Sequence, residues 1–448
     1  MGGDITLRGA ELVLPTGVID GDIAIRDGRI VAIGHVDQPV GEIVDARGLT
    51  VLPGVIDPQV HFREPGAEHK EDLESGGRAA AAGGVTAFLE MPNTRPPTID
   101  AAAVADKIAR ATGRSRAHFG FFLGATPDNV AETAAASGVP GIKIFMGSST
   151  GTLLVHEQDA LERHFAAARV PLVVHAEDEL RLRARSGLYP GVDDPGLHPI
   201  IRDPQTALIA TRRAVDLAVR HQKRLHVLHL SSADEVAFLR DRPDDGLVTT
   251  ETLPQYLWLD ASWYARLGTH LQMNPPVRDL RHQRALWAGL LDGTIQCIAT
   301  DHAPHTLDEK AQPYGKAPSG MPGVELSVPL MLHAVHDGRC SIRHVARWMS
   351  EAPARIYGLV GKGRLALGAD GDLTVVDRRV SRSVRADALQ SRAGWSPFEG
   401  WTLRGWPVMT VLLGRPVFRD GAFADGVFGE PLRFDPPARC PRQPGAAT

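Results

Sequence analysis

The chain has 448 residues, and its composition, 43% hydrophobic and 23% charged, is ordinary for a soluble globular protein. Its formal net charge is −4, and no block of like charges is long enough to form an arm that binds nucleic acid or membranes. We therefore expect no nucleic-acid or membrane partner, and a small molecule as the ligand.

The three cysteines, Cys297, Cys340 and Cys440, lie far apart in the sequence. This spacing argues against a disulfide framework and fits a reducing compartment. No apolar run approaches the ~18 residues that a membrane span needs, and the N-terminus lacks the basic-then-apolar pattern of a signal peptide. The cytoplasm is therefore the expected location.

Short strands separated by turn signals fill the first part of the chain, residues 1–52. They include ITLRGAELVLP and GDIAIRDGRIVAIG, and the second contains an Asp-Gly hairpin turn. The same style returns in residues 359–430, for example in WTLRGWPVMTVLLG. These two β-rich ends predict one small β-sandwich domain assembled from both termini. The remaining residues, 431–448, form a Pro-rich tail that we expect to be poorly ordered.

Between these ends, residues 53–358 alternate short β-rich runs with longer segments of helical period. The helical segments include 71–82, 156–168 and 204–222, and the last begins with a proline suited to a first helical turn. The candidate strands are 51–61, 83–91, 117–124, 141–147, 170–178, 224–232, 247–253 and 295–305. Eight repeats of a strand followed by a helix are typical of an α/β fold, the (β/α)8 TIM barrel.

Metal-binding residue types gather at the ends of these strands, where barrel enzymes place their catalytic groups. Asp57, Gln59 and His61 alternate along the first strand, so their side chains leave the same face. A DxHxH run would present two imidazoles to one metal ion, and here an amide replaces the first. The candidates at the other strand ends are Lys143, His175, His229, Asp301, His302 and His305. One such histidine is more often a packed core residue, but so many at one end of a barrel indicate a metal site.

Lys143 stands between two isoleucines on a strand that should be almost wholly buried. A buried ammonium is costly unless it is paired or neutralised. One interpretation is an ion pair with Asp301. The other is a lysine of depressed pKa that adds CO2, giving a carbamate whose two oxygens bridge two metal ions. With His61, His175, His229 and Asp301, this group would complete a binuclear centre suited to zinc.

Eight motifs occur in order across residues 53–325: PGVIDPQVHFREPG, GGVTAFLEMPNT, GIKIFMGSSTG, VHAED, HVLHLSSA, MNPPVR, ATDHAPH and GMPGVE. On these motifs the sequence resembles the dihydroorotases of the amidohydrolase superfamily, of the longer bacterial class I type. The resemblance implies a barrel flanked by a composite β-sandwich, up to two zinc ions, and a carbamate on Lys143.

The resemblance also implies roles for individual residues. His61, with the position of Gln59, would bind the more buried metal. His175 and His229 would hold the second, and Lys143 would be the carbamylated bridge. Asp301 would bind the first metal and shuttle a proton. The residues expected to contact the substrate are Arg63, Asn93, Asn274 and His305, of which Arg63 and Asn93 would hold its carboxylate.

Gln59 is the main departure from the family pattern, because histidine is usual there. PQYL, at 254–257, is a second departure, since relatives often have PHHL or PHYL. An amide oxygen is a hard, neutral ligand that binds zinc more weakly than imidazole does. We therefore expect weakened occupancy of the first metal site, with the second site largely intact.

The implied reaction is the reversible hydrolysis of L-dihydroorotate to N-carbamoyl-L-aspartate, a step of pyrimidine biosynthesis, by a metal-bound hydroxide. The guanidinium of Arg63 suits a bidentate grip on a carboxylate. Its alternative role is a surface ion pair with Glu64 or Glu68.

Two other functions remain open from the sequence. Dihydropyrimidinases and allantoinases share the metal ligands but typically lack the arginine and asparagine of HFREPG and MPNT. Some dihydroorotase-like chains have lost metal ligands and serve as non-catalytic partners of aspartate carbamoyltransferase, and Gln59 is compatible with such a role. A homodimer or another homo-oligomer is the expected assembly.

Overall fold

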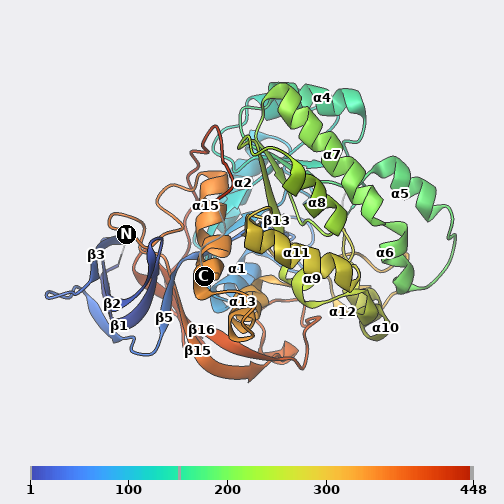
Figure 1. Ribbon diagram of the computed structural model, residues 1–448. Helices are drawn as coiled ribbons and strands as arrows, with labels where there is room; N and C mark the ends of the chain where they lie inside the picture. Colours follow the sequence, from blue (N-terminus) through green and yellow to red (C-terminus); the bar gives the residue numbers. More distant parts are fainter. Residues whose placement is uncertain (1–2, 150–152, 444–448) are drawn as a thin grey trace.

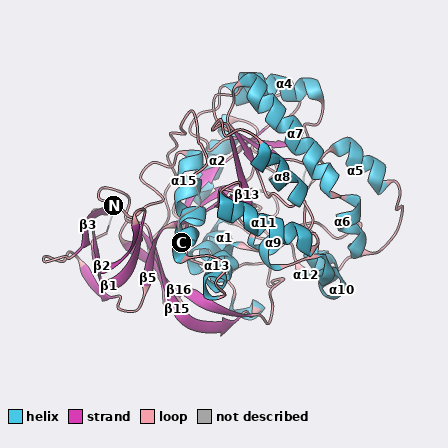
Figure 2. Cartoon of the chain, in the orientation of Figure 1, coloured by secondary structure: helices cyan, strands magenta, loops and turns pink. Residues whose placement is uncertain are grey.

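The computed structural model describes residues 3–149 and 153–443. Figure 1 shows two parts, a barrel surrounded by helices and, beside it, a sheet built from both ends of the chain. The colouring of Figure 2 separates the strand-rich part from the helix-covered barrel. No described helix is both long enough and apolar enough to cross a membrane.

Each predicted barrel run contains a strand. The strands are β6 (Val55–Val60), β7 (Val85–Glu90), β8 (His118–Phe121) with β9 (Leu123–Gly124), β10 (Ile142–Phe145), β11 (Leu172–His175), β12 (Leu225–Val227), β13 (Val248–Thr252) and β14 (Cys297–Ile298). Paired strands in this series are parallel. The barrel closes where the backbone N–H of His61 donates to the carbonyl of His302 at 2.7 Å. The predicted (β/α)8 barrel is confirmed.

Helices, of which the last four lie after β14, follow these strands along the chain. They are α1 (Leu73–Ala82), α2 (Ala101–Ala111), α3 (Val130–Ala134), α4 (Gln158–Ala167), α5 (Glu179–Ser186), α6 (His198–Ile201), α7 (Pro204–His221), α8 (Ala233–Asp241), α9 (Pro254–Trp258), α10 (Tyr264–Leu267), α11 (Leu280–Asp292), α12 (Leu307–Lys310), α13 (Ser327–His336), α14 (Ile342–Ala346) and α15 (Ala352–Tyr357). The side chain of Asp203 caps α7, and Pro204 takes its first turn as predicted.

Both ends of the chain contribute to one nine-stranded sheet. Its strands are β1 (Ile5–Leu14), β2 (Gly17–Arg26), β3 (Arg29–Gly34), β4 (Glu42–Asp45), β5 (Thr50–Pro53), β15 (Leu373–Ser383), β16 (Thr402–Leu412), β17 (Arg415–Arg419) and β18 (Ala422–Phe423). The halves meet where β5 pairs antiparallel with β15. The composite β-domain is confirmed, and β5 extends past residue 52 to Pro53, where the barrel was expected to begin.

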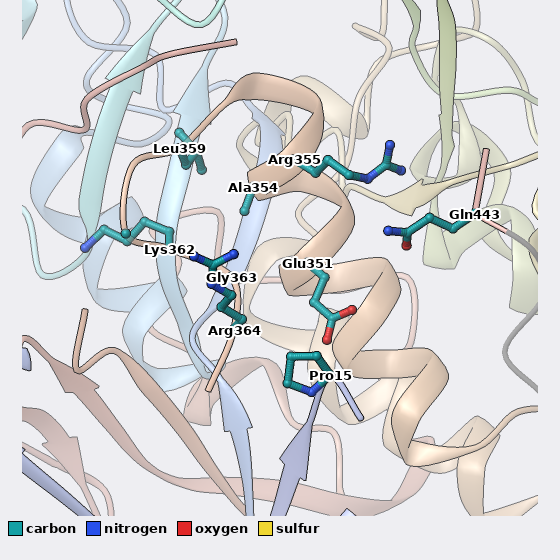
Figure 3. Close-up of a pocket in the computed structure, with 10 residues that line it drawn as sticks. Pro15, Glu351, Ala354, Arg355, Leu359, Lys362, Gly363, Arg364 and Gln443 are labelled. Atoms are coloured by element: carbon teal, nitrogen blue, oxygen red, sulfur yellow. The ribbon is translucent and has the colours of Figure 1, made fainter. Parts of the chain in front are cut away.

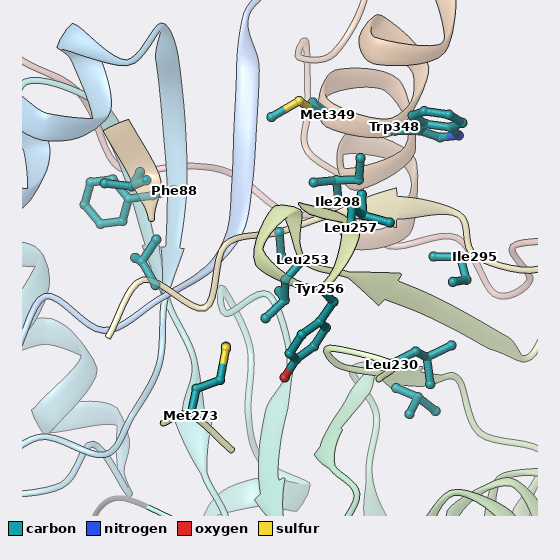
Figure 4. Close-up of a cluster of buried hydrophobic side chains, with 14 of the residues drawn as sticks. Phe88, Leu230, Leu253, Tyr256, Leu257, Met273, Ile295, Ile298, Trp348 and Met349 are labelled. Carbon is teal, nitrogen blue, oxygen red and sulfur yellow. The ribbon is translucent and has the colours of Figure 1, made fainter. Parts of the chain in front are cut away.

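Successive side chains of the barrel strands point alternately into two different hydrophobic clusters. On β11, Leu172 and Val174 pack outward into the large cluster that joins strands and helices, part of which Figure 4 shows around Leu253, Leu257 and Ile298. Val173 instead belongs to a second cluster, inside the barrel. A parallel strand covered on both faces needs apolar residues at both phases, which explains its continuous hydrophobic runs.

The Pro-rich tail differs from its prediction. Leu432 and Cys440 are buried, with 8% and 1% of their surfaces exposed, in the same cluster as residues from inside the barrel and from α15. The backbone N–H of Cys440 donates to the carbonyl of Gly246 at 2.7 Å. The expectation of poor order is wrong for residues 431–443, because their apolar side chains cover the end of the barrel where the strands begin. Residues 444–448 lie outside the described part.

Candidate functional site

The first group of predicted ligands meets where β6 and β14 end. Nε2 of His61 lies 3.0 Å from Oδ1 of Asp301, and Nδ1 of the same ring lies 2.7 Å from the amide oxygen of Asn93. Nε2 of Gln59 donates to the same Asp301 oxygen at 3.0 Å. Each ring nitrogen of His61 therefore faces an oxygen atom. A metal cation in place of a proton between Nε2 and the Asp301 carboxylate would satisfy both atoms.

The second group lies on β11 and just after β12. Nδ1 of His175 and Nε2 of His229 are 3.0 Å apart. Nε2 of His175 lies 3.0 Å from Oε2 of Glu177. A carboxylate at this distance favours a proton on that nitrogen, which would leave the other nitrogen to bind a metal. Arg202 in turn pairs with Glu177. Burial raises the pKa of Glu177. The positive charge of Arg202 and the hydrogen bond with His175 outweigh burial and hold this pKa at about 2.

Lys143 points into the barrel from β10 and is 1% exposed. The predicted alternative of an ion pair with Asp301 is not formed, and no described carboxylate pairs with this amine, whose Nζ lies 4.5 Å from the centre of the Phe145 ring. Burial lowers the pKa of Lys143 to about 7, against the opposing attraction of Asp301 and Glu251. A large fraction of the amine is therefore uncharged near neutral pH, the form that reacts with CO2.

The protonation states suit metal binding, which requires neutral imidazoles and ionised carboxylates. Burial lowers the pKa values of His61, His175 and His229. Burial alone would raise the pKa of Asp301, but the hydrogen bond and charge of His61 outweigh it and lower the value.

Three site residues have left-handed backbone conformations: Arg63 has φ 66°, His229 φ 37° and Asp301 φ 47°. Such values are uncommon for residues other than glycine, cost of order 1–3 kcal/mol each, and cluster at functional sites. His229 shows the consequence. In a regular strand its side chain would point to the same side as that of Val227, which packs outward. The left-handed backbone instead accompanies a side chain that contacts His175 at the barrel mouth, the end of the barrel where the strands stop.

Arg63 lies beside the first group of predicted metal ligands, Gln59, His61 and Asp301, which is called the first metal group below. It is 7% exposed, its Nε donates to the carbonyl of Pro304 at 3.1 Å, and its Nη2 lies 3.2 Å from Nε2 of His305. Glu64 pairs instead with Arg114. The alternative of a surface ion pair is therefore wrong, and the guanidinium is held at the barrel mouth.

The other two predicted substrate contacts are tied to neighbouring loops. Nζ of Lys70 lies 3.1 Å from Nδ1 of His305, and the indole N–H of Trp395 donates to the His305 carbonyl at 2.8 Å. Oδ1 of Asn274 accepts from Nε2 of His198 at 3.0 Å. His305 is thus enclosed by a cation and by a segment of the C-terminal domain, whereas Asn274 stays partly exposed.

A further buried group lies deeper in the barrel. Among the described residues, His226, Glu251 and Cys297 form the one cluster in which three potential ligand atoms lie within 4.8 Å of one another. Both nitrogens of His226 are already paired, with Thr249 at 2.8 Å and with Glu251 at 3.0 Å. This cluster was not predicted. Its histidine is fully paired, although Oε1 of Glu251 has no hydrogen-bond partner in the described structure.

A cavity of about 370 Å³ lies outside the barrel, against α15 (Figure 3). Glu351, Arg355 and Arg364 are among its lining residues, and none of the predicted ligands is. Arg343 pairs with Glu351, and Arg355 donates to Cys440. The charges around this cavity thus serve to attach α15 and the tail.

Glu177 and Lys70 were not predicted from the sequence. Glu177 had a usable signal, since it stands two residues after His175 in VHAED. Lys70 gave none, because only the fold brings it to His305, which is 235 residues away.

Known proteins with similar sequences and structures support the predicted family. The chain matches the amidohydrolase family over residues 50–417. It is 36% identical to a dihydroorotase of Methanothermobacter thermautotrophicus, covering 90% of this chain and 92% of that protein. A dihydroorotase of Halobacterium salinarum is 38% identical, with 92% and 96% covered. An allantoinase of Streptomyces avermitilis is 34% identical, with 94% and 97% covered.

Among solved structures, an L-hydantoinase (dihydropyrimidinase) from Arthrobacter aurescens superposes with a TM-score of 0.92 at 30% identity, covering 97% of this chain and 100% of that one. Fold, motifs and relatives agree over most of the chain. This protein is therefore a hydrolase that belongs to the amidohydrolase family.

Proposed function

We propose that this enzyme is a dihydroorotase, which catalyses the reversible hydrolysis of L-dihydroorotate to N-carbamoyl-L-aspartate. The observation that carries the proposal is the buried guanidinium of Arg63, fixed by Pro304 beside the first metal group. A substrate carboxylate bound there would place a ring amide next to Asp301. Dihydropyrimidines without a carboxylate have no need of this anchor.

The same residues support a zinc-binding centre with a carbamate on Lys143. His175 and His229 offer two converging nitrogens, and the buried amide oxygen of Gln59 has no hydrogen-bond partner in the described structure. These atoms fit a metal pair held by Gln59, His61 and Asp301 on one side and by the two histidines on the other. Bound metal ions would lower the pKa of water and polarise the amide carbonyl.

The chain itself supplies binding and proton transfer. Arg63 and Asn93 hold the carboxylate and so orient the ring. Asp301 is ionised and already accepts two hydrogen bonds at one oxygen, so its other oxygen can take the proton of the attacking water. It then returns that proton to the leaving nitrogen.

Comparative assays test the substrate. Purified protein supplied with zinc and bicarbonate is offered L-dihydroorotate, N-carbamoyl-L-aspartate, allantoin, hydantoin and dihydrouracil under one set of conditions. Turnover of the first two, at least tenfold above the others in kcat/KM, is expected. Preferred turnover of allantoin would support an allantoinase instead, in line with the relative from Streptomyces avermitilis.

Metal analysis and intact mass test the centre. We expect bound metal and a Lys143 that carries an added CO2 in protein kept with bicarbonate. Metal-free protein with unmodified lysine, inactive on every substrate after zinc and bicarbonate are added, would favour a non-catalytic partner of aspartate carbamoyltransferase.

A further inference from the structure

The side-chain amide of Gln59 uses its nitrogen in a hydrogen bond but not its oxygen. Its side-chain nitrogen donates to Asp301 at 3.0 Å, while its oxygen is buried without a partner in the described structure, and the residue is 1% exposed. A buried carbonyl oxygen without a donor costs about 1–3 kcal/mol, so this atom calls for a cation or a donor from outside the chain.

The neighbours of this oxygen decide which cation fits. On the Gln59 side of the mouth, the available donors are the amide oxygen, a carboxylate oxygen of Asp301 and one nitrogen of His61. A bridging carbamate on Lys143 would add one oxygen to each side. On the other side, the donors are the two nitrogens of His175 and His229. The two halves of the mouth therefore differ in chemistry, one rich in oxygen and one in nitrogen.

Metal ions distinguish between such donor sets. Imidazole suits zinc, whereas carboxylate and carbonyl oxygens suit harder ions such as manganese. Replacing one imidazole by an amide oxygen thus lowers the affinity for zinc at one half of the centre more than at the other.

We propose that the centre is asymmetric: His175 and His229 hold zinc, and the oxygen of Gln59 makes the opposite half a site for a harder divalent ion of the manganese class. This inference rests on the metal centre of the proposed function, although not on the identity of the substrate. A centre with zinc at the histidine pair alone is the competing arrangement, and it would leave the Gln59 oxygen unsatisfied.

The test is metal competition, measured without substrate. Metal-free protein is equilibrated with bicarbonate, one equivalent of Zn²⁺ and an excess of Mn²⁺, and bound metals are counted by mass spectrometry while Mn²⁺ is followed by electron paramagnetic resonance. One bound Zn²⁺ and one bound Mn²⁺ are expected. In Gln59→His, a second equivalent of Zn²⁺ should displace the Mn²⁺, with the Mn-to-Zn preference falling tenfold or more.

Two further variants make the result specific. Gln59→Glu keeps an oxygen donor and should bind Mn²⁺ at least as tightly as the natural chain. Gln255→His is the matched control: Gln255 is also 1% exposed with an unpaired oxygen, but its nitrogen donates to the carbonyl of Thr300. This control should keep the natural metal preference.

Three results would overturn the asymmetric centre. They are a natural chain that binds its second Zn²⁺ as tightly as Gln59→His does, a chain that binds one ion under all conditions, and a Gln255→His variant with an equally altered preference. A protein that binds both metals and does not hydrolyse dihydroorotate would refute the substrate and leave this inference standing. Circular dichroism of each variant confirms that it has folded.

Discussion

The two ends of the barrel interior hold similar residues in different states. At the mouth, Gln59 Oε1 and His229 Nδ1 are buried without partners among residues 3–149 and 153–443, and two imidazoles face each other at 3.0 Å. Deeper in the barrel, both nitrogens of His226 are paired with side chains of β13, and the tail and α15 cover that end. Both regions contain buried histidines, carboxylates and potential metal ligands.

The difference shows that burial of ionisable groups does not by itself identify a site. In the deeper cluster both nitrogens of the histidine are satisfied by neighbouring side chains, because an unpaired buried group is costly, although Oε1 of Glu251 lacks a partner among the described residues. A binding site leaves polar atoms of several residues pointing into a shared space, where a ligand must satisfy them. Changes at the mouth should therefore abolish function, whereas changes at the base should lower stability and leave the chemistry intact.

The largest effect is expected at Lys143. Lys143→Met removes the proposed bridge between the two metal groups, so kcat/KM for dihydroorotate should fall by roughly 1,000-fold or more, since metal assistance contributes several kcal/mol. Metal content should fall with it. Steady-state assays and mass spectrometry measure both, and activity within tenfold of the natural enzyme would contradict the role of a bridge.

Arg63→Gln should separate substrates. Loss of a charge-assisted grip costs about 2–3 kcal/mol, so kcat/KM for dihydroorotate should fall about 100-fold, while slow hydrolysis of dihydrouracil changes little. Arg110→Gln is the control, since Arg110 pairs with Asp106 on the surface. Equal losses on both substrates would show that Arg63 supports the fold of the mouth and not the carboxylate.

Glu177→Gln should weaken metal binding at the histidine pair. The carboxylate faces His175 at 3.0 Å, and such partners typically contribute 10–100-fold to metal affinity. Competition with a chelator measures the change. Glu179→Gln is the control, because Glu179 binds the backbone of Ser148 and the side chain of Arg183. Unchanged zinc affinity in Glu177→Gln would count against this role.

At the base, the end of the barrel where the strands begin, Leu432→Ala should lower the free energy of unfolding by about 2 kcal/mol, since it removes a buried side chain of the C-terminal segment that covers this end. The kcat of the folded enzyme should stay within twofold. Arg433→Ala, which alters an exposed side chain of the same segment, should change neither. A large loss of kcat in Leu432→Ala would show that base and mouth are coupled.

The last prediction concerns the pH dependence of stability. Burial sets the pKa of Lys143 at about 7 in the folded chain, against its ordinary value of 10.5. Between these values the unfolded chain binds more protons, so metal-free protein without bicarbonate should gain stability with rising pH relative to Lys143→Met. Denaturant titrations at pH 7 and pH 9 measure the difference, and parallel curves for the two proteins would contradict it.

Local signals predicted much of this molecule. Hydrophobic runs bounded by Gly and Pro gave the barrel strands, and the phase of Lys143 between two isoleucines placed its amine inside. The tail was harder, because composition describes only its local preference for irregular structure. Leu432 and Cys440 become ordered by contact with α15 and the barrel interior, which are remote in the sequence.

Within the site, the orientation of His229 was likewise not predictable from local sequence. Strand alternation would turn it outward with Val227, and the left-handed backbone accompanies its contact with His175. The orientation of Gln59, with nitrogen toward Asp301 and oxygen unpaired, likewise depends on a partner 242 residues away.

The sequence by itself determined the barrel, the composite β-domain and the kinds of ligand available, because these follow from periodicity and side-chain chemistry along short stretches. Only the tertiary structure decided which polar atoms are paired and which remain open. The hydrogen-bond partner of a polar group often lies on a distant strand, so a local sequence pattern does not predict whether the group is paired.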